Sequence, residues 1–562
     1  MKIFHLCHPY ITQYRWKLTI YITIILVATT ITLLSPHILG DFLDTLIAGT
    51  DITSVLYFCA IFGGLNVLRI LLGYITSIIY VKMQTQMGYD LNMYIVRHVQ
   101  GLSLSYSNNQ DSAYLNQRIN NDANSLIIFC ITILQNIITN VIMFIVPFVI
   151  LLTMNWFVAV LLMVFLVIYM TLYVVFKKPL YNASFAFKEA QSKFFSNLYD
   201  QLKYIKLIKI NSIQPEMNKR ADKGFGGLLT TAVHNQKVNY LYSGLDGFIT
   251  TLAQIALFVV GGIQILAGNF TIGMFTIFSS YFSMMLGSSR YFFNLGASYQ
   301  RVLVAYDRIM EVLNQKAECN GDVVLDDIYA IELKNLEFVY SNACNADVNH
   351  ANLISNKKTI QNFNTTFKKG KIYCIAGENG AGKSTLINLI MGMYIDEYLG
   401  SITYNGIDIK NIDMQKARKN LFGFAEQEPV LINDTILYNL TFEDGEDGEE
   451  NPSTHHQDLA THLHTLNLQD FITKNTLNLT INDKNTNTSG GEKQKISILK
   501  VLMKNPAVMI FDEPTSALDV ETSGRFMGYL QKIKTDKIII LITHDEGVKG
   551  WCDEVVRIEQ FK

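Results

Sequence analysis

The fold of this 562-residue chain is decided by the stretch Gly377-Glu378-Asn379-Gly380-Ala381-Gly382-Lys383-Ser384. The stretch matches the phosphate-binding pattern G-x-x-x-x-G-K-[ST]. An apolar run at 372–376 precedes it and a helix-like run at 385–391 follows it. In a strand–loop–helix unit of this kind, successive backbone N–H groups surround phosphate groups and the helix N-terminus adds the positive end of its dipole. The stretch therefore predicts a nucleotide site in an α/β domain.

A second segment narrows the prediction, because Thr488-Ser489-Gly490-Gly491-Glu492 resembles the signature motif of the ABC (ATP-binding cassette) ATPases. The apolar run 508–513 ends in two carboxylates and is similar to the Walker B strand of that family. A phosphate-binding pattern can occur by chance in a chain of this length. The whole set of motifs, in the order and spacing of the family, is not expected by chance.

The resemblance implies roles for individual residues. Glu513 is expected to polarise the attacking water, and His544 to contact the γ-phosphate. Gln427 resembles the glutamine of the Q-loop. Mg²⁺ is expected at Ser384, Gln427 and Asp512, and catalysis at Glu513, His544, Gln427 and Lys383. ATP is expected to bind at Tyr340, Gly377, Glu378, Asn379, Gly380, Ala381, Gly382, Lys383, Ser384, Thr385, Ser489, Gly490, Gly491 and Asp519.

The chain departs from the family pattern at several positions. Thr488 replaces the usual leucine of the signature motif, and Glu492 replaces the usual glutamine. Asn485 stands where the preceding loop usually has glycine. An Asn-rich segment at 341–356 follows Tyr340 and weakens its assignment as the aromatic residue that stacks on adenine. None of these departures removes a catalytic group.

Composition divides the chain into an apolar first part, of about 315 residues, and a second part of ordinary soluble composition. Hydrophobic residues make up 49% of the chain, and the mean hydropathy is +0.21, which favours a membrane protein. The net charge of −2, with no basic tract, argues against a nucleic-acid partner. The seven cysteines form no C-x-x-C pair, so neither a disulfide framework nor a zinc site is expected.

Six membrane spans are predicted, because a helix needs about 20 apolar residues to cross a bilayer. The apolar stretches are 18–39, 55–80, 126–154, 157–176, 248–267 and 272–286. No cleavable signal peptide is expected before them. Residues 1–17 place apolar and aromatic side chains on one helical face, which predicts an interfacial helix.

Charge predicts the orientation of these spans. The short loops at 41–53, 155–156 and 267–271 contain no Lys or Arg, whereas 177–223 is rich in Lys and also contains Arg220. The positive-inside rule therefore places the long loops, both termini and the ATPase domain in the cytoplasm. The protein is expected to be a multi-pass protein of a bacterial plasma membrane, in contact with its lipids.

The arrangement resembles a type IV (exporter-fold) ABC half-transporter. The family implies an all-α six-helix transmembrane domain at 1–318, followed by an α/β P-loop ABC ATPase domain at 325–562. Coupling regions are expected at 106–122 and 204–216. Since the family closes two cassettes around two ATP molecules, a second half-transporter is required as a partner. A homodimer is favoured because this chain has both Glu513 and His544, and a heterodimer is the alternative.

The implied function is ATP hydrolysis coupled to the export of an amphiphilic small molecule, peptide or lipid by alternating access. A lipid flippase, an importer with the exporter fold, and a regulatory or channel-like ABC protein remain alternatives. Arg69, Asp246 and Arg290 lie at similar depths in the second, fifth and sixth spans. Ionisable residues inside spans are costly and are candidates for function. We expect Asp246 near Arg290 and Arg69 facing a cavity; the alternative is that these groups reach the headgroups or only lock helices together.

Overall fold

The computed structural model describes residues 2–49, 51–108, 115–116, 118–340, 359–378, 380–442, 462–464, 466, 477, 479–481, 489–516 and 518–558. The chain forms two compact units. The first contains Met1–Ile95 and Asn116–Glu311, and the second contains Val96–Leu115 and Val312–Lys562. The predicted features at 341–356, Asn379, Asn485 and Thr488 lie outside the described residues.

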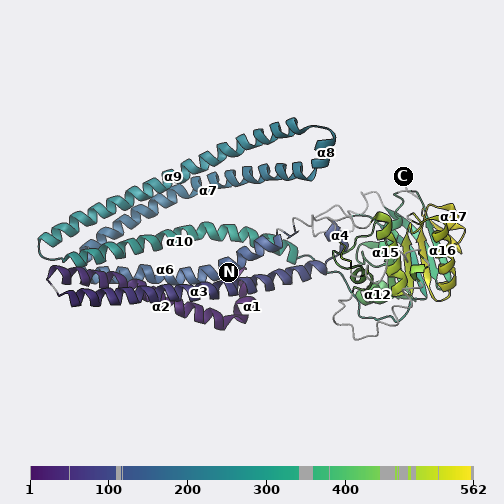
Figure 1. Ribbon diagram of the computed structural model, residues 1–562, viewed down its shortest axis with the longest axis horizontal. Coiled ribbons are helices and arrows are strands. Elements are labelled where there is room, and N and C mark those ends of the chain that lie inside the picture. Colours follow the sequence, from purple (N-terminus) through teal and green to yellow (C-terminus); the bar gives the residue numbers. More distant parts are fainter. Residues whose placement is uncertain are drawn as a thin grey trace. The chain divides into compact units, whose positions relative to one another are not determined.

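The first unit consists of long helices (Figure 1). They are α1 (Lys2–Gln13), α2 (Arg15–Ile47), α3 (Ile52–Gln100), α6 (Ala123–Met154), α7 (Trp156–Lys203), α8 (Ile205–Ile210), α9 (Gln214–Leu266) and α10 (Ile272–Leu313). A short π-helical turn, Arg118–Asp122, leads into α6. The helices α7 and α9 run side by side and are joined through the short α8, which lies in the predicted second coupling region.

Five of the described helices are long and apolar enough to cross a membrane, and they overlap the first five predicted spans. The sixth predicted span forms the first part of α10, which is not among those five. Its hydroxyl groups explain the lower hydropathy. Ser283, Ser288 and Ser289 each donate a hydrogen bond to the carbonyl four residues earlier, so the helix itself satisfies them.

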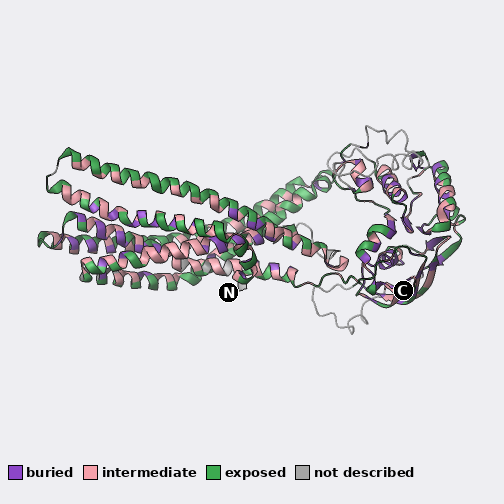
Figure 2. Cartoon of the chain, turned by 90° about the horizontal axis from the view of Figure 1, so that it is seen from below, coloured by how far each residue is buried: buried purple, intermediate pink, exposed green. Residues whose placement is uncertain are grey.

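Many apolar side chains on these helices are exposed in the single chain (Figure 2). Such faces are expected where lipid or another subunit surrounds a helix. The predicted N-terminal helix is present as α1, and its Ile3 and Cys7 are buried against the other helices. A hydrogen bond of 2.9 Å from the Tyr14 hydroxyl to the Asp90 carboxylate links the junction of α1 and α2 to α3.

The helices α2 and α10 make a close contact through two glycines, Gly40 and Gly273. A Cβ atom on Gly273 would lie 2.2 Å from the Gly40 carbonyl oxygen and 2.4 Å from the Asp44 carboxylate, so only glycine fits there. The Asp44 carboxylate accepts hydrogen bonds from the Gly273 N–H at 2.7 Å and the Thr271 hydroxyl at 2.5 Å. It thereby caps the first turn of α10, where backbone N–H groups have no partner within the helix.

The second unit contains two sheets. The antiparallel sheet has the order β2-β1-β4-β5, and the parallel sheet has the order β6-β7-β8-β3-β9. The strands are β1 (Ala330–Phe338), β2 (Ile360–Lys368), β3 (Lys371–Ala376), β4 (Tyr398–Tyr404), β5 (Ile407–Asp408), β6 (Phe422–Ala425), β7 (Val508–Asp512), β8 (Ile538–Ile542) and β9 (Glu554–Arg557). The helices include α11 (Lys383–Ile390), α12 (Met414–Leu421), α13 (Ile436–Thr441), α15 (Gly490–Lys504), α16 (Val520–Ile533) and α17 (Glu546–Lys549).

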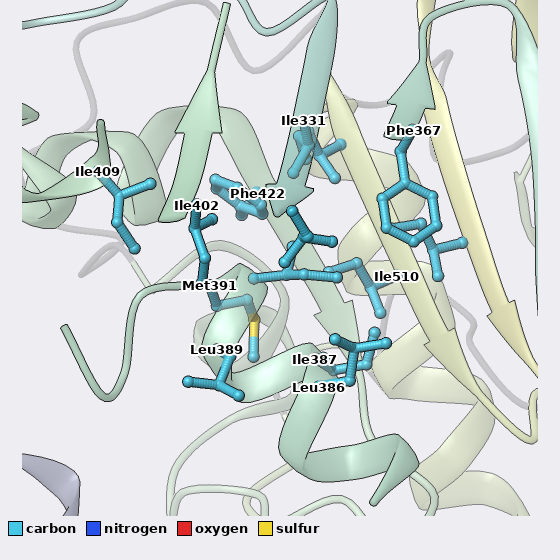
Figure 3. Packing of buried hydrophobic residues seen from close by; sticks show 14 of the residues in the cluster. Ile331, Phe367, Leu386, Ile387, Leu389, Met391, Ile402, Ile409, Phe422 and Ile510 are labelled. Carbon is cyan, nitrogen blue, oxygen red and sulfur yellow. The ribbon is translucent and has the colours of Figure 1, made fainter. Parts of the chain in front are cut away.

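One hydrophobic core joins both sheets to α11. Ile402 of β4, Ile510 of β7 and Leu386 of α11 belong to the same buried cluster (Figure 3). The side chain of Leu386 is fully buried, as are those of its neighbours Ile387 and Leu389. The helix that follows the phosphate-binding stretch is therefore held firmly by its apolar face.

A short helix, α4 (Leu104–Asn108), belongs to the second unit and packs on its two-sheet domain. Leu104 packs against the hydrophobic core, and the Ser105 hydroxyl donates a hydrogen bond to the Glu397 carboxylate. Burial raises the pKa of Glu397. The Glu318 N–H donates to the Gly101 carbonyl at 2.7 Å, and Glu318 forms a bidentate ion pair with Arg418 at 2.7 and 2.9 Å. The helix α4 begins two residues before the predicted first coupling region, 106–122.

We predict that Gly273→Ala lowers the free energy of unfolding by about 1–3 kcal/mol, because the new methyl group has no space between Gly40 and Asp44. Thermal unfolding in detergent micelles would show a lower apparent Tm. Gly287→Ala is the matched control on the same helix, since a Cβ there meets nothing within 4 Å. It should be neutral or stabilising, by up to about 1 kcal/mol. Equal Tm values for the two variants would contradict the close contact.

Candidate active site

Four neighbouring strands of the parallel sheet bring the predicted catalytic residues to one edge. In the order β6-β7-β8-β3, the residues at or just after the strand ends are Gln427, Asp512 with Glu513, His544 and Gly377. All neighbouring pairs among these strands are parallel, so their carboxyl ends lie at the same edge. Ligands of open α/β sheets bind at this edge.

Glycines in the phosphate-binding stretch adopt left-handed backbone conformations that other residues rarely adopt. Gly382 has a φ of 95°, in the left-handed region, and is the N-cap of α11. The Lys383 ammonium lies over its own loop and donates hydrogen bonds to the carbonyl oxygens of Gly377, at 2.9 Å, and Glu378, at 3.1 Å. It also lies 3.0 Å from Nε2 of His544. Burial lowers the pKa of Lys383, and the nearby carboxylates of Asp512 and Glu513 partly oppose that shift.

Glu513 lies at the centre of the polar contacts. Nε2 of Gln427 donates a hydrogen bond to Oε2 of Glu513 at 2.7 Å, and Nε2 of His544 is 3.8 Å from Oε1. The structure therefore brings together Lys383, Gln427, Glu513 and His544. Burial, with the Glu513 charge beside it, raises the pKa of Asp512 to about 6. Two neighbouring carboxylates of this kind favour a bound cation.

The residues predicted to hold Mg²⁺ fit that ion by their chemistry. Ser384 offers a hydroxyl oxygen, Asp512 a half-buried carboxylate, and Gln427 an amide oxygen that is left over when its NH₂ group bonds Glu513. Mg²⁺ prefers oxygen ligands and keeps several waters beside one or two carboxylates and substrate phosphates.

The backbone of Glu513 is strained, with a φ of 48°. A left-handed backbone is uncommon for a residue with a Cβ atom and persists where surrounding contacts hold it. Here the Glu513 N–H donates to the Ile542 carbonyl at 2.9 Å, and its carbonyl accepts from Nε2 of Gln494 at 2.7 Å. The sequence reasoning missed Gln494. Its place two residues after the signature segment 488–492 was the available signal.

Tyr340 lies beside the first turn of α11. Its hydroxyl is 2.9 Å from the Thr385 hydroxyl, and its ring meets the rings of Phe338 and Tyr394 edge to face. The side chain is 41% exposed, so part of the ring is accessible. The structure thus places the predicted adenine-stacking residue next to the phosphate-binding stretch.

Ser489 and Asp519 act as helix caps. Ser489 is the N-cap of α15, and its N–H donates to the Glu492 carboxylate at 2.6 Å in a capping box. The departure from glutamine to Glu492 therefore keeps an acceptor at this position. Asp519 caps α16 and accepts from the Thr522 N–H at 2.9 Å, which lowers the pKa of Asp519. Gly490 and Gly491 form the start of α15.

The predicted pair within the membrane domain is present. Arg290 of α10 forms an ion pair of 2.8 Å with Asp246 of α9 and donates to the Thr250 hydroxyl at 3.1 Å. Its guanidinium also lies 5.8 Å from the centre of the Tyr169 ring. The Arg290 side chain is 40% exposed in the single chain, and that of Asp246 is 16% exposed. Arg69 is exposed on α3.

Residues 18–289 match the family described as "ABC transporter transmembrane region", and residues 360–516 match the family described as "ABC transporter". The chain belongs to the ABC transporter family. A solved structure of a bacterial Atm1-family ABC exporter with ATP bound has a TM-score of 0.79 to this chain, with 18% identity. The match covers 97% of this chain and 94% of the other. It shows that this ABC transporter has the exporter fold, with a helical membrane domain followed by an α/β cassette.

Curated relatives share the same family. ABC transporter B family member 1 of Dictyostelium discoideum is 30% identical over 327 residues, which are 57% of this chain and 34% of that protein. The alpha-hemolysin translocation ATP-binding protein of Escherichia coli O157:H7 is 28% identical over 356 residues, which are 62% of this chain and 47% of that protein. This ABC transporter chain thus spans less than two thirds of the length of either relative.

We predict that Asp512→Asn stabilises the nucleotide-free and Mg²⁺-free protein above about pH 6. The ordinary carboxyl pKa is 3.8 and the folded value is about 6, so ionisation disfavours the fold. The gain in stability is absent below pH 3.8, the ordinary carboxyl pKa. It grows as the pH rises from 3.8 to about 6, and it is complete above the folded pKa of about 6. Because the side chain is half exposed, the expected gain at pH 7.5 is only about 1–2 kcal/mol.

Thermal unfolding with a chelator at pH 4.5 and pH 7.5 measures this difference. Asp519→Asn is the control with the opposite sign, because hydrogen bonds from Thr522 lower the pKa of Asp519. At pH 7.5, where Asp519 is ionised in the wild type, the Asp519→Asn protein should be less stable than the wild type. An Asp512→Asn protein that is less stable than the wild type at pH 7.5 would refute the prediction.

Proposed function

We propose that this chain is one half of an ATP-driven exporter of the plasma membrane, with its cassette in the cytoplasm. The observation that carries the proposal is the meeting of Lys383, Gln427, Glu513 and His544 at the carboxyl edge of the parallel sheet. A chain with this site and with helices that can cross a membrane is suited to couple ATP hydrolysis to transport. The exported compound is proposed to be an amphiphilic small molecule, peptide or lipid.

The chemistry proposed for the site is electrostatic positioning. The N–H groups at the start of α11 and the Lys383 ammonium stabilise charge on the phosphates of ATP. Lys383 first has to exchange its bonds to the Gly377 and Glu378 carbonyls for bonds to phosphate oxygens. Ser384, Gln427 and Asp512 would hold Mg²⁺, which would supply positive charge to neutralise the phosphates.

Glu513 is proposed to orient or deprotonate the attacking water, and His544 to contact the γ-phosphate. The Gln427 amide holds the Glu513 carboxylate, while His544 lies close to both Lys383 and Glu513. These contacts link the proposed base to both the phosphate-binding lysine and the Q-loop. The exposed part of the Tyr340 ring is proposed to stack on adenine.

The proposed partner is a second copy of this chain. In the proposed dimer, Ser489, Gly490 and Gly491 of each subunit face the nucleotide held by Lys383 of the other. Since each copy has Glu513 and His544, both sites of a homodimer would be competent. Closure of two cassettes on ATP would draw α4 and α8 together and turn the membrane domains outward, and hydrolysis would reset them.

The Asp246–Arg290 pair is proposed to lie on the substrate pathway. A partly exposed guanidinium, paired with a carboxylate and next to Tyr169, provides both charges and an aromatic face. Ion pairs in membrane helices are costly and mark functional paths more often than lipid-facing surfaces. The pair therefore suits a substrate with a polar or charged part.

We predict that Glu513→Gln retains ATP binding and traps a closed dimer, while steady-state hydrolysis falls by about 100-fold or more. The amide keeps the shape of the side chain but cannot accept a proton from water. Phosphate release by the purified protein and its oligomeric state with ATP would be measured together. Hydrolysis close to that of the wild type would rule out Glu513 as the base.

We also predict that Arg290→Ala lowers the ATPase stimulation by a transported compound more than it lowers basal ATPase. The compound would be the strongest stimulator of the wild type from a panel of amphiphiles, peptides and lipids. Arg308→Ala is the control on the same helix, because the Arg308 side chain is 53% exposed and its contact with Asp122 is long, at 3.8 Å. Arg308→Ala should preserve the ratio of stimulated to basal rate. If Arg290→Ala lowers both rates equally, the pair only locks helices.

A further inference from the structure

A buried glutamine on the signature helix contacts the backbone of the proposed base. Gln494 of α15 is only 4% exposed. Its Nε2 donates hydrogen bonds to the Glu513 carbonyl, at 2.7 Å, and to the Ser516 hydroxyl, at 3.2 Å. Burying an amide is unfavourable unless it is hydrogen-bonded. Here both protons of the NH₂ group are donated to acceptors just after β7.

The Glu513 carbonyl is an unusually crowded acceptor. Besides Gln494, it lies 2.9 Å from the Ser516 hydroxyl and 3.2 Å from the Ser516 N–H. On its other side, the Glu513 N–H is fixed to the Ile542 carbonyl of β8. A residue with a Cβ atom keeps a left-handed φ, here 48°, where several contacts hold it. Gln494 supplies the shortest of the three contacts to the carbonyl.

The direction of the Glu513 side chain depends on that backbone. A relaxation of φ to negative values would rotate the Cα–Cβ bond away from its present direction. The carboxylate would then leave Gln427 and His544, which it contacts at 2.7 and 3.8 Å. The side-chain contacts alone do not fix the residue, because Gln427 and His544 are both on loops after strand ends.

We propose that Gln494 is a positioning residue for ATP hydrolysis, which holds the Glu513 backbone in the conformation that directs its carboxylate into the site. This inference rests on the proposed role of Glu513 as the base. Gln494 touches neither ATP nor water in this role and acts only through Glu513. Since Ser489 begins the same helix, Gln494 also joins the signature motif to the base of its own subunit.

The test is Gln494→Met in the full-length protein, since methionine has a similar length and no amide. We expect the kcat for ATP hydrolysis to fall by about 10-fold, the scale of a lost buried hydrogen bond, with the KM for ATP within about 2-fold of the wild type. Ser497→Ala is the matched control, because Ser497 is another buried polar residue on α15. It should leave kcat within about 2-fold of the wild type. A wild-type kcat in Gln494→Met would overturn the inference.

A double-mutant comparison separates positioning from a general loss of structure. In the Glu513→Gln background, Gln494→Met should cause no further loss of the residual hydrolysis, because the group through which it acts is already gone. An equal loss in both backgrounds would overturn the inference. If Gln494→Met does not fold, Ser516→Ala removes a hydroxyl from the same carbonyl at an exposed position and should show the same pattern with a smaller loss.

The outcomes also separate this inference from the proposed function. An inactive Glu513→Gln protein together with a fully active Gln494→Met protein overturns only the role of Gln494. A fully active Glu513→Gln protein overturns the proposed base and, with it, the role of Gln494.

Discussion

The parallel pairing of β6, β7, β8 and β3 is the constraint on which the site depends. Neighbouring strands lie about 4.8 Å apart, so residues just past their carboxyl ends are within hydrogen-bonding reach of one another. The register places Asp512 opposite Ile542, and this sets Glu513 next to the loop that carries His544. A slip of one residue would move each side chain to the other face of the sheet. The buried isoleucines and phenylalanines of these strands therefore fix the chemistry as well as the fold.

The charges at this edge are arranged for an anionic ligand with its cation. Asp512 and Glu513 are adjacent carboxylates, and their mutual repulsion adds to the burial that raises the pKa of Asp512. Lys383 is close enough to oppose that shift, yet its hydrogen bonds go to two carbonyl oxygens of its own loop and to Nε2 of His544. A lysine held by neutral acceptors is available to phosphate at small cost. A divalent cation would remove the repulsion between the Asp512 and Glu513 carboxylates. Its binding would also compensate the buried negative charge of Asp512.

Much of this could be predicted from the sequence, because motifs report local geometry. The strand–loop–helix around Lys383, the carboxylates after β7 and the pairing of Asp246 with Arg290 are confirmed. Periodicity and hydropathy also predicted the long helices, although α10 is less apolar than a typical span. The contact of Gln494 with Glu513 could not be predicted, because it depends on how α15 packs against the end of β7. The left-handed φ of Glu513 could not be predicted from the sequence either, since glutamate has no preference for that conformation.

The helix α15 connects the signature segment, at Ser489, with Glu513 at the end of β7, which belong to two separate sequence motifs. Its N-cap is Ser489, whose N–H is held by Glu492, and Gln494 lies between one and two turns further along. Since α15 is one helix of 15 residues with a buried apolar face, we expect it to move as a unit. An anion that displaced the Glu492 carboxylate from the N-terminus of α15 would therefore shift Gln494 together with the cap. Because Gln494 is bonded to the Glu513 carbonyl, that shift would reach the strained residue directly. The strain at Glu513 is thus located where a small movement of one helix would change the direction of the side chain that we propose as the base.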